Sequence, residues 1–227
     1  MRIFRPRHAA LLALLILAAV APALAASVTI SVSGADGKPA ADTVVMLRRP
    51  GGFQGFDVRE IPVITQKDIR FSPYVTVVPP RGTVRFVNQD NFAHHLRSMP
   101  SGPMGSVAPS QEFEFRMAAA RGNNFSSAEL KVESSGAIVL GCHLHGSMRG
   151  HIFVTPTPWY AVTDDKGRAK IEVPDGPATL ALWHPDQVTE QPGNPVNVAG
   201  DGALAQTLNF TPRKRPPPQR PKGEYEQ

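Results

Sequence analysis

Residues 141–150 read Gly141-Cys142-His143-Leu144-His145-Gly146-Ser147-Met148-Arg149-Gly150. Cys142 is the one cysteine of the 227-residue chain, and His145 and Met148 follow it by three and six positions. Thiolate, imidazole and thioether are the donors that copper prefers. A tight loop with Gly146 can fold all three around one ion, because each donor must lie roughly 2.0–2.3 Å from it. The segment therefore predicts a metal site on a loop, with a fourth donor from elsewhere in the chain.

The fourth donor is expected to be His94. Five of the seven histidines lie between residues 94 and 151. His94 and His95 follow a strand expected to end at Asn88, and the cysteine loop follows a strand expected over residues 137–140. A β-sandwich can bring two such loops together at one end. His151, which begins the strand after the loop, is expected at the surface.

The upstream segment carries a resemblance to a known family. Asn88-Gln89-Asp90-Asn91-Phe92-Ala93-His94 resembles the Asn-x-Asp/Glu-x-x-x-His element of cupredoxins, the plastocyanin and amicyanin group. Residues 71–73 and 81–86 resemble the strand pair before that element, and the Cys-x-x-His-x-x-Met spacing followed by Arg-Gly is closest to amicyanin. The resemblance covers residues 61–154. It implies one type 1 (blue) copper ion with His94, Cys142 and His145 as equatorial ligands and Met148 as the weak axial ligand.

Two positions depart from the family pattern. His95 stands where family members often have Asn or Ser, and His143 stands where a small polar residue is common. Both imidazoles could make similar hydrogen bonds, tune the potential through contacts with the ligands, or ligate the metal themselves. Alternation along a strand disfavours ligation by His95, because it points residue 95 away from the face that His94 uses. Zinc is disfavoured because its sites seldom use a thioether, and a binuclear copper centre would need a second cysteine.

The chain as a whole predicts an all-β fold. Short β-branched or aromatic runs recur between Gly, Pro, Asp and Asn residues, which is typical of sandwiches and barrels. We expect a cupredoxin Greek-key β-sandwich and a second small β-sandwich module. The second module is expected because residues 159–183, with two Asp/Gly turns, resemble carboxypeptidase regulatory-like (transthyretin-like) β-modules. Expected strands lie at residues 28–32, 43–47, 75–78, 83–87, 137–140, 151–154, 159–163, 168–173, 178–183 and 204–210.

The predicted domain order places one module inside the other. Residues 26–56 would supply the first strands of the transthyretin-like module, residues 57–156 the cupredoxin domain, and residues 157–211 the remainder of the first module. The alternative is that residues 28–47 are the first strands of the cupredoxin sandwich. The favoured combination resembles bacterial methylamine-utilisation-like proteins, a family name that does not establish a role in methylamine metabolism.

Residues 1–25 resemble a secretory signal peptide. Arg2, Arg5 and Arg7 precede an apolar run over residues 9–21, and Ala23-Leu24-Ala25 is a cleavage site of small residues. The run is too short to span a bilayer, which needs about 20 residues. We therefore expect a periplasmic protein with no integral membrane segment in the mature chain.

The charge distribution excludes one class of partner. The net charge of +5 comes from the signal peptide and from the tail at residues 212–227, because residues 26–211 carry 16 basic and 17 acidic side chains. A nucleic-acid surface is therefore not indicated. The tail is rich in Pro, Lys and Arg and is expected to be disordered.

Together these features predict a periplasmic protein that transfers single electrons between redox protein partners. The alternative is a periplasmic copper carrier or storage protein, and a third reading is an adhesion or scaffold protein in which copper is incidental. No enzymatic role is expected, because the chain shows no arrangement of catalytic residues and the ligands for one copper ion only.

Overall fold

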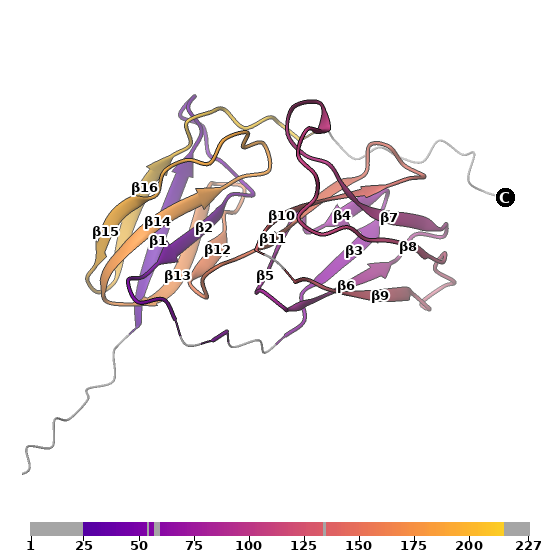
Figure 1. The fold of residues 1–227 in the computed structure, drawn as a ribbon, viewed down its shortest axis with the longest axis horizontal. Helices are drawn as coiled ribbons and strands as arrows, with labels where there is room; N and C mark the ends of the chain where they lie inside the picture. The colour runs from indigo at the N-terminus through magenta and orange to yellow at the C-terminus, as the bar shows by residue number, and fades with distance from the viewer. Residues whose placement is uncertain (1–24, 54, 57–59, 134, 216–227) are drawn as a thin grey trace, which may run out of the picture.

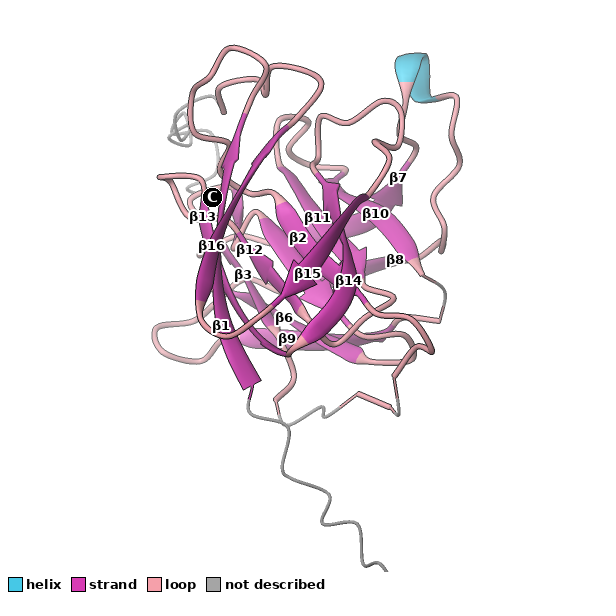
Figure 2. Ribbon diagram, turned by 90° about the vertical axis from the view of Figure 1, so that its left-hand side faces the viewer, coloured by secondary structure: helices cyan, strands magenta, loops and turns pink. Residues whose placement is uncertain are grey.

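A computed structural model describes residues 25–53, 55–56, 60–133 and 135–215 of the chain. The predicted signal peptide, apart from Ala25, and residues 216–227 of the predicted tail lie outside the described residues. The regular secondary structure of the described part consists of strands and one short 3-10 helix, η1 (Pro103–Gly105), so the prediction of an all-β fold is confirmed (Figure 2). The strands are β1 (Ala25–Ser33), β2 (Val44–Arg48), β3 (Val63–Lys67), β4 (Arg70–Ser72), β5 (Val75–Val78), β6 (Thr83–Asn88), β7 (His94–Met99), β8 (Glu114–Met117), β9 (Ser126–Lys131), β10 (Gly136–Cys142), β11 (Arg149–Val154), β12 (Tyr160–Val162), β13 (Arg168–Pro174), β14 (Gly176–Trp183), β15 (Asn194–Val198) and β16 (Gly202–Thr207).

Strands from both ends of the described chain form one sandwich, which we call the terminal sandwich. Its two sheets have the strand orders β13-β1-β16 and β12-β2-β14-β15. Strand β1 shows why they pack: Ala26, Val28, Ile30 and Val32 alternate along it and are all buried. Alternate residues of a strand share one face, so this pattern gives the strand one apolar face for the core between the sheets.

Strands β3–β11 form a second sandwich, which we call the central sandwich (Figure 1). Its sheets have the orders β5-β11-β10-β7-β8 and β4-β3-β6-β9, so most neighbouring strands are not consecutive in the chain and the chain crosses between the sheets. Phe86, Leu96, Ile138 and Ile152 are among the large side chains buried between them. Such crossovers are typical of Greek-key sandwiches.

The two sandwiches meet through a third apolar cluster. Val44 and Met46 of β2 pack with Val75 of β5 and Phe153 of β11. The ring of Phe153 also stacks on Trp183, with ring centroids 4.8 Å apart. The terminal sandwich therefore covers the outer face of the β5-β11-β10-β7-β8 sheet at its β5–β11 side, where the two sandwiches lie side by side in Figure 1.

The expectation that His151 lies at the surface is wrong. The residue is buried at this junction, where its Nε2 lies 3.2 Å from the Tyr74 hydroxyl and its ring lies against Trp183. Burial is the main cause that lowers the pKa of His151 to about 4. The negative charge of Asp186 raises this pKa, whereas the positive charges of His184 and Arg149 lower it further. The imidazole is therefore neutral in the folded protein near pH 7.

Acidification should destabilise the metal-free protein through His151. Between pH 6.5 and about 4 the unfolded chain takes up a proton at this residue and the folded chain does not, so stability is lost as the pH falls through this range. At pH 5 the loss amounts to about 2 kcal/mol. Urea unfolding at pH 7.5 and pH 5 gives the free energy of unfolding that is lost on acidification. This loss should be smaller by about 2 kcal/mol in His151→Gln than in the unmodified protein. Equal losses of unfolding free energy in both proteins would show that His151 does not cause the pH dependence.

The expectation of a disordered tail at residues 212–227 is wrong for its first four residues. Residues 212–215 lie against the body of the protein, where Arg213 pairs with Asp186 at 2.7 Å. Arg215 pairs with Asp42 at 2.6 Å, and its guanidinium lies 4.7 Å from the ring centroid of Tyr74. Asp42 belongs to the terminal sandwich and Tyr74 directly precedes β5 of the central one. Arg215 therefore links the two sandwiches.

Candidate metal centre

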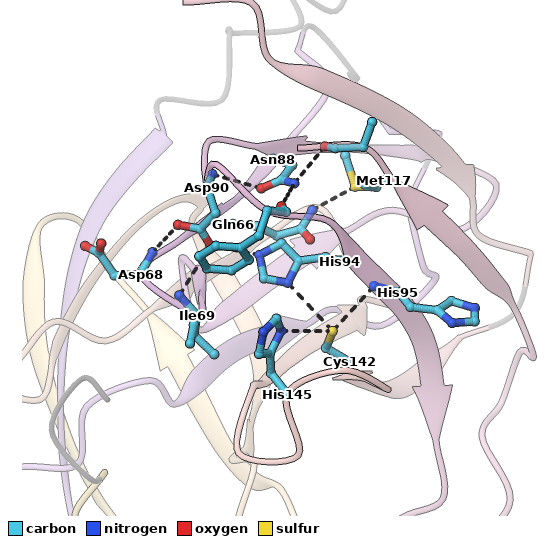
Figure 3. A network of polar contacts seen from close by, with 12 residues as sticks. Gln66, Asp68, Ile69, Asn88, Asp90, His94, His95, Met117, Cys142 and His145 are labelled. Atoms are coloured by element: carbon cyan, nitrogen blue, oxygen red, sulfur yellow. Dashed lines mark hydrogen bonds and ion pairs between the residues drawn. The ribbon is translucent and has the colours of Figure 1, made fainter. Parts of the chain in front are cut away.

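His94, Cys142 and His145 converge at one end of the central sandwich (Figure 3). His94 begins β7 and Cys142 ends β10, and these antiparallel neighbours place Cys142 opposite Leu96. His94 lies two residues from Leu96 and therefore on the same face of the sheet. The Cys142 Sγ atom lies 3.7 Å from Nδ1 of His94 and 3.5 Å from Nδ1 of His145. All three residues are buried.

These separations fit a metal ion between the three donors. Donors placed roughly 2.0–2.3 Å from an ion in a trigonal plane lie about 3.5–3.7 Å from one another. The two sulfur–nitrogen distances have this size, and the three ligand atoms all lie within 4.8 Å of one another. A His₂Cys set of this kind suits copper. The donor set and its spacing therefore accommodate the ion that the sequence predicts.

Met148 is held close to the same end of the sandwich by a turn. Its backbone N–H donates to the carbonyl oxygen of His145 at 2.9 Å, which closes the loop after Cys142. The Met148 side chain is fully buried in the core cluster that also contains Cys142. The thioether predicted as the axial donor thus lies in the apolar interior beside the loop.

Asp90 fixes the orientation of His94. One of its carboxylate oxygens lies 2.8 Å from Nε2 of His94, so the other ring nitrogen is directed at Cys142. The same carboxylate accepts the backbone N–H groups of Asp68 at 2.7 Å and Ile69 at 3.3 Å. Burial raises the pKa of Asp90, but the hydrogen bonds from His94 and these backbone groups outweigh burial and lower the pKa overall. The carboxylate therefore stays ionised and orients the ring, as carboxylates do behind metal-binding histidines.

Asn88 in turn holds the segment that carries Asp90. Its side-chain amide donates to the carbonyl oxygens of Phe92 at 2.9 Å and Ala118 at 2.8 Å, and its oxygen accepts the N–H of Asp90 at 2.9 Å. Asn88 is fully buried, so these bonds are formed away from competing water. The Asn-x-Asp-x-x-x-His segment is therefore a hydrogen-bonded loop that presents His94 in one position.

The thiol of Cys142 lies among groups that favour the thiolate. Burial raises its pKa, but His94 and the backbone N–H groups of His95 and Leu144 outweigh burial, and the pKa is lowered overall. The His95 N–H lies 3.4 Å from Sγ. For His94, burial lowers the pKa, but hydrogen bonds with Asp90 and Cys142 raise it overall. A lowered thiol pKa favours metal binding, because the ligand is the thiolate.

A second group of potential ligands lies nearby, and only its two histidines stand out in the sequence. His95, Glu114 and His143 place their ligand atoms within 4.8 Å of one another. The sequence predicts no ligand at Glu114. It lies on β8, a strand that was not predicted. The alternation of charged and aromatic residues over 112–115 is the signal that could have identified this strand.

No helix in the described part of the chain is long and apolar enough to cross a membrane.

Comparisons with known proteins give distant similarities only. No protein-family model matches the sequence, and no curated protein matches it. Among solved structures, an oxidised amicyanin mutant is 18% identical, with 49% of this chain and 98% of that chain covered and a TM-score of 0.33. A purple cupredoxin from Nitrosopumilus maritimus is 17% identical, with 41% and 99% covered and a TM-score of 0.34. A copper-containing nitrite reductase from Thermus scotoductus is 20% identical, with 47% and 25% covered and a TM-score of 0.35.

By their own descriptions, the second of these structures is a cupredoxin and the third contains copper, and similarity at this level assigns no function to the present chain. The resemblance to methylamine-utilisation-like proteins and to carboxypeptidase regulatory-like modules stays a prediction.

Proposed function

We propose that this chain is a periplasmic mononuclear type 1 copper protein that transfers single electrons between redox protein partners. His94, Cys142 and His145 would be the equatorial ligands and Met148 the weak axial ligand. The observation that carries the proposal is the convergence of one sulfur and two imidazole nitrogens, with sulfur–nitrogen distances of 3.5 and 3.7 Å, in a buried site. Bound copper would supply the chemistry by alternating between Cu(II) and Cu(I).

The protein supplies a ligand frame that is already in place. His94 is oriented by Asp90, Cys142 is fixed at the end of a paired strand, and the turn that ends at Met148 positions His145. Burial excludes water from these donors, and the thiolate of Cys142 is favoured by the N–H groups around it. A frame that need not rearrange suits electron transfer, because little reorganisation accompanies the change in charge.

The loop tip offers a place for a redox partner to dock. Leu144 lies between Cys142 and His145 in the sequence, and 45% of its surface is exposed, although it is a large apolar residue. A partner that packs on this exposed side chain would come close to the ligands without opening the buried site to water. The burial of His94 and Cys142 also favours electron transfer over a carrier, because a carrier must release its ion.

The domain division and the location are part of the proposal. Pairing of β1 with β13 and β16, and of β2 with β12 and β14, supports a module interrupted by the central sandwich. The central sandwich would then be the cupredoxin domain at residues 57–156. The sequence of residues 1–25 supports export to the periplasm.

Spectroscopy of the copper-loaded mature protein tests the proposed function. We expect an intense visible absorption from sulfur-to-Cu(II) charge transfer and an EPR signal with narrow copper hyperfine splitting. Both should disappear with a reductant and return with an oxidant, because the ion stays bound in both states. A colourless protein with Cu(II) bound would refute the proposal. Loss of the ion on reduction would favour the carrier or storage alternative.

A further inference from the structure

The second group of ligands lies on the opposite face of the sheet from the first. His95 directly follows His94, and His143 directly follows Cys142, so alternation directs each pair of neighbours to opposite faces. Figure 3 shows the ring of His95 pointing away from Cys142 and His94. On this outer face the terminal sandwich covers the β5–β11 side, and the β7–β8 side, where Glu114 lies, is open to solvent.

Three neighbouring segments fix the positions of these side chains. The order β10-β7-β8 places β7 in the middle, and Glu114 of β8 lies opposite Arg97, two pairs along from His95 and therefore on the same face of the sheet. The backbone N–H of His143 donates to the carbonyl oxygen of His95 at 2.9 Å, which holds the residue after β10 beside β7. The cluster is therefore built on paired backbone, and not on a free loop.

The ligand atoms are arranged around a small space. Oε1 of Glu114 lies 2.7 Å from Nε2 of His95 and 3.3 Å from Nε2 of His143. The two imidazole rings have centroids 4.8 Å apart. Donors of a tetrahedral ion, each roughly 2.0–2.1 Å from it, lie about 3.3 Å from one another. Small side-chain rotations would thus place all three donors at coordination distance from one ion.

We infer that His95, Glu114 and His143 form a second metal site, which binds a divalent transition-metal ion. Two imidazoles and one carboxylate are ligands that Zn²⁺ and Cu²⁺ both accept, and Cu²⁺ is bound more tightly by such a set. The inference uses none of the ligands proposed for the first site and does not depend on the proposed function.

Solvent access distinguishes this site from the first one. The side chains of Glu114 and His143 are 53% and 37% exposed, whereas His94 and Cys142 are buried. Three protein donors leave at least one coordination position for water or another small ligand. The second site should therefore exchange its ion readily.

The two sites lie close together, and this closeness should affect the redox potential of the first site. The peptide bonds His94–His95 and Cys142–His143 each join a ligand of one site to a ligand of the other. A second dication so close to the first site disfavours Cu(II) relative to Cu(I), because the repulsion between two positive ions is larger for Cu(II). Zn²⁺ at the second site should therefore shift the potential of the first site to a more positive value.

Zinc titration of the full mature chain tests the second site, and isothermal titration calorimetry gives the stoichiometry and affinity. In the Cys142→Ser background, which lacks the thiolate of the first site, we expect about one Zn²⁺ per chain. Adding His95→Ala and His143→Ala should weaken this binding by at least about tenfold. The first site is spared by these changes, because the N–H that lies near the Cys142 sulfur belongs to the backbone of residue 95. Glu112→Gln is the matched control, since it removes an exposed carboxylate two positions from Glu114 and should leave zinc binding unchanged.

Glu114→Gln provides an independent variant at an exposed position, where failure to fold is not expected. It should weaken zinc binding and abolish the positive shift of potential that Zn²⁺ causes in the copper-loaded protein. Equal zinc affinity with and without His95, Glu114 and His143 would overturn the inference. Zinc binding at this cluster without a blue copper spectrum would refute the proposed function alone, and a blue spectrum without zinc binding at the cluster would refute the second site alone.

Discussion

Cys142→Ser should abolish the intense visible absorption of the copper-loaded protein and weaken copper binding more than a hundredfold. The absorption arises from charge transfer between the thiolate and Cu(II), and serine has no sulfur. Loss of a residue that merely orients a ligand already costs about 10–100-fold in metal affinity, and loss of the ligand itself should cost more. The lowered pKa of Cys142 strengthens this expectation, because His94 and two backbone N–H groups are arranged to favour a negative charge that serine does not carry near neutral pH.

Leu144→Ala is the matched control for this substitution. It changes the exposed residue two positions away and keeps all four proposed ligands and the backbone N–H of residue 144 near the sulfur. Its spectrum and copper affinity should equal those of the unmodified protein, and only the rate of electron transfer to a partner that docks at the loop tip should fall. Full copper affinity in Cys142→Ser, measured by competition with a copper chelator, would show that the ion is bound elsewhere.

The candidate ligands could be proposed from the sequence because they lie in short segments. Cys142, His145 and Met148 fall within seven positions, and the hydrogen bonds from Asn88 through Asp90 to His94 also form within seven. Local geometry of this kind is determined by local residues. The juxtaposition of the two segments follows from the pairing of β7 with β10, and the expected β-sandwich allowed for it by bringing the two loops to one end.

The features that the sequence analysis missed depend on contacts between distant segments. His151 is buried because the terminal sandwich packs against β11, and nothing near residue 151 in the sequence indicates this packing. Glu114 joins His95 and His143 because β8 pairs with β7, and β8 was not predicted. Residues 212–215 look like a polar tail by composition, yet Asp186 and Asp42 bind their two arginines. Register and domain packing, which decide these cases, have weak signals in a single sequence.

The two ligand groups show how one sheet can serve two environments. The inner face of β7 and β10 meets the other sheet of the central sandwich, which buries His94 and Cys142. The terminal sandwich covers the outer face at β5, at β11 and near Ala137 at the start of β10, so His95 and His143 stay near solvent. Residues that are adjacent in the chain thus lie in different environments. In the pairs His94-His95 and Cys142-His143, the first residue is buried and the second is near solvent.

Asp90→Ala should destabilise the metal-free protein by about 3 kcal/mol and weaken copper binding by about 10–100-fold. The substitution removes the acceptor for His94 Nε2 and for the N–H groups of Asp68 and Ile69. A buried donor without a partner costs about 1–3 kcal/mol. Asp68 and Ile69 also have positive φ angles of 53° and 57°, a strained conformation that the carboxylate stabilises by binding their N–H groups. Copper affinity falls because His94 is no longer held with Nδ1 toward Cys142.

Two variants separate these causes in urea unfolding and copper competition experiments. Asp90→Asn keeps one acceptor oxygen and should lose only part of the stability and affinity. Asn91→Ala changes the exposed neighbour and should lose neither. If Asp90→Ala reduced stability but left copper affinity and the visible spectrum intact, the carboxylate would support the turn at residues 68–69 without orienting His94. Reduced affinity at unchanged stability would show the opposite. One buried carboxylate, that of Asp90, is hydrogen-bonded both to the turn at residues 68–69 and to His94. We therefore expect the losses of stability and of copper affinity to occur together.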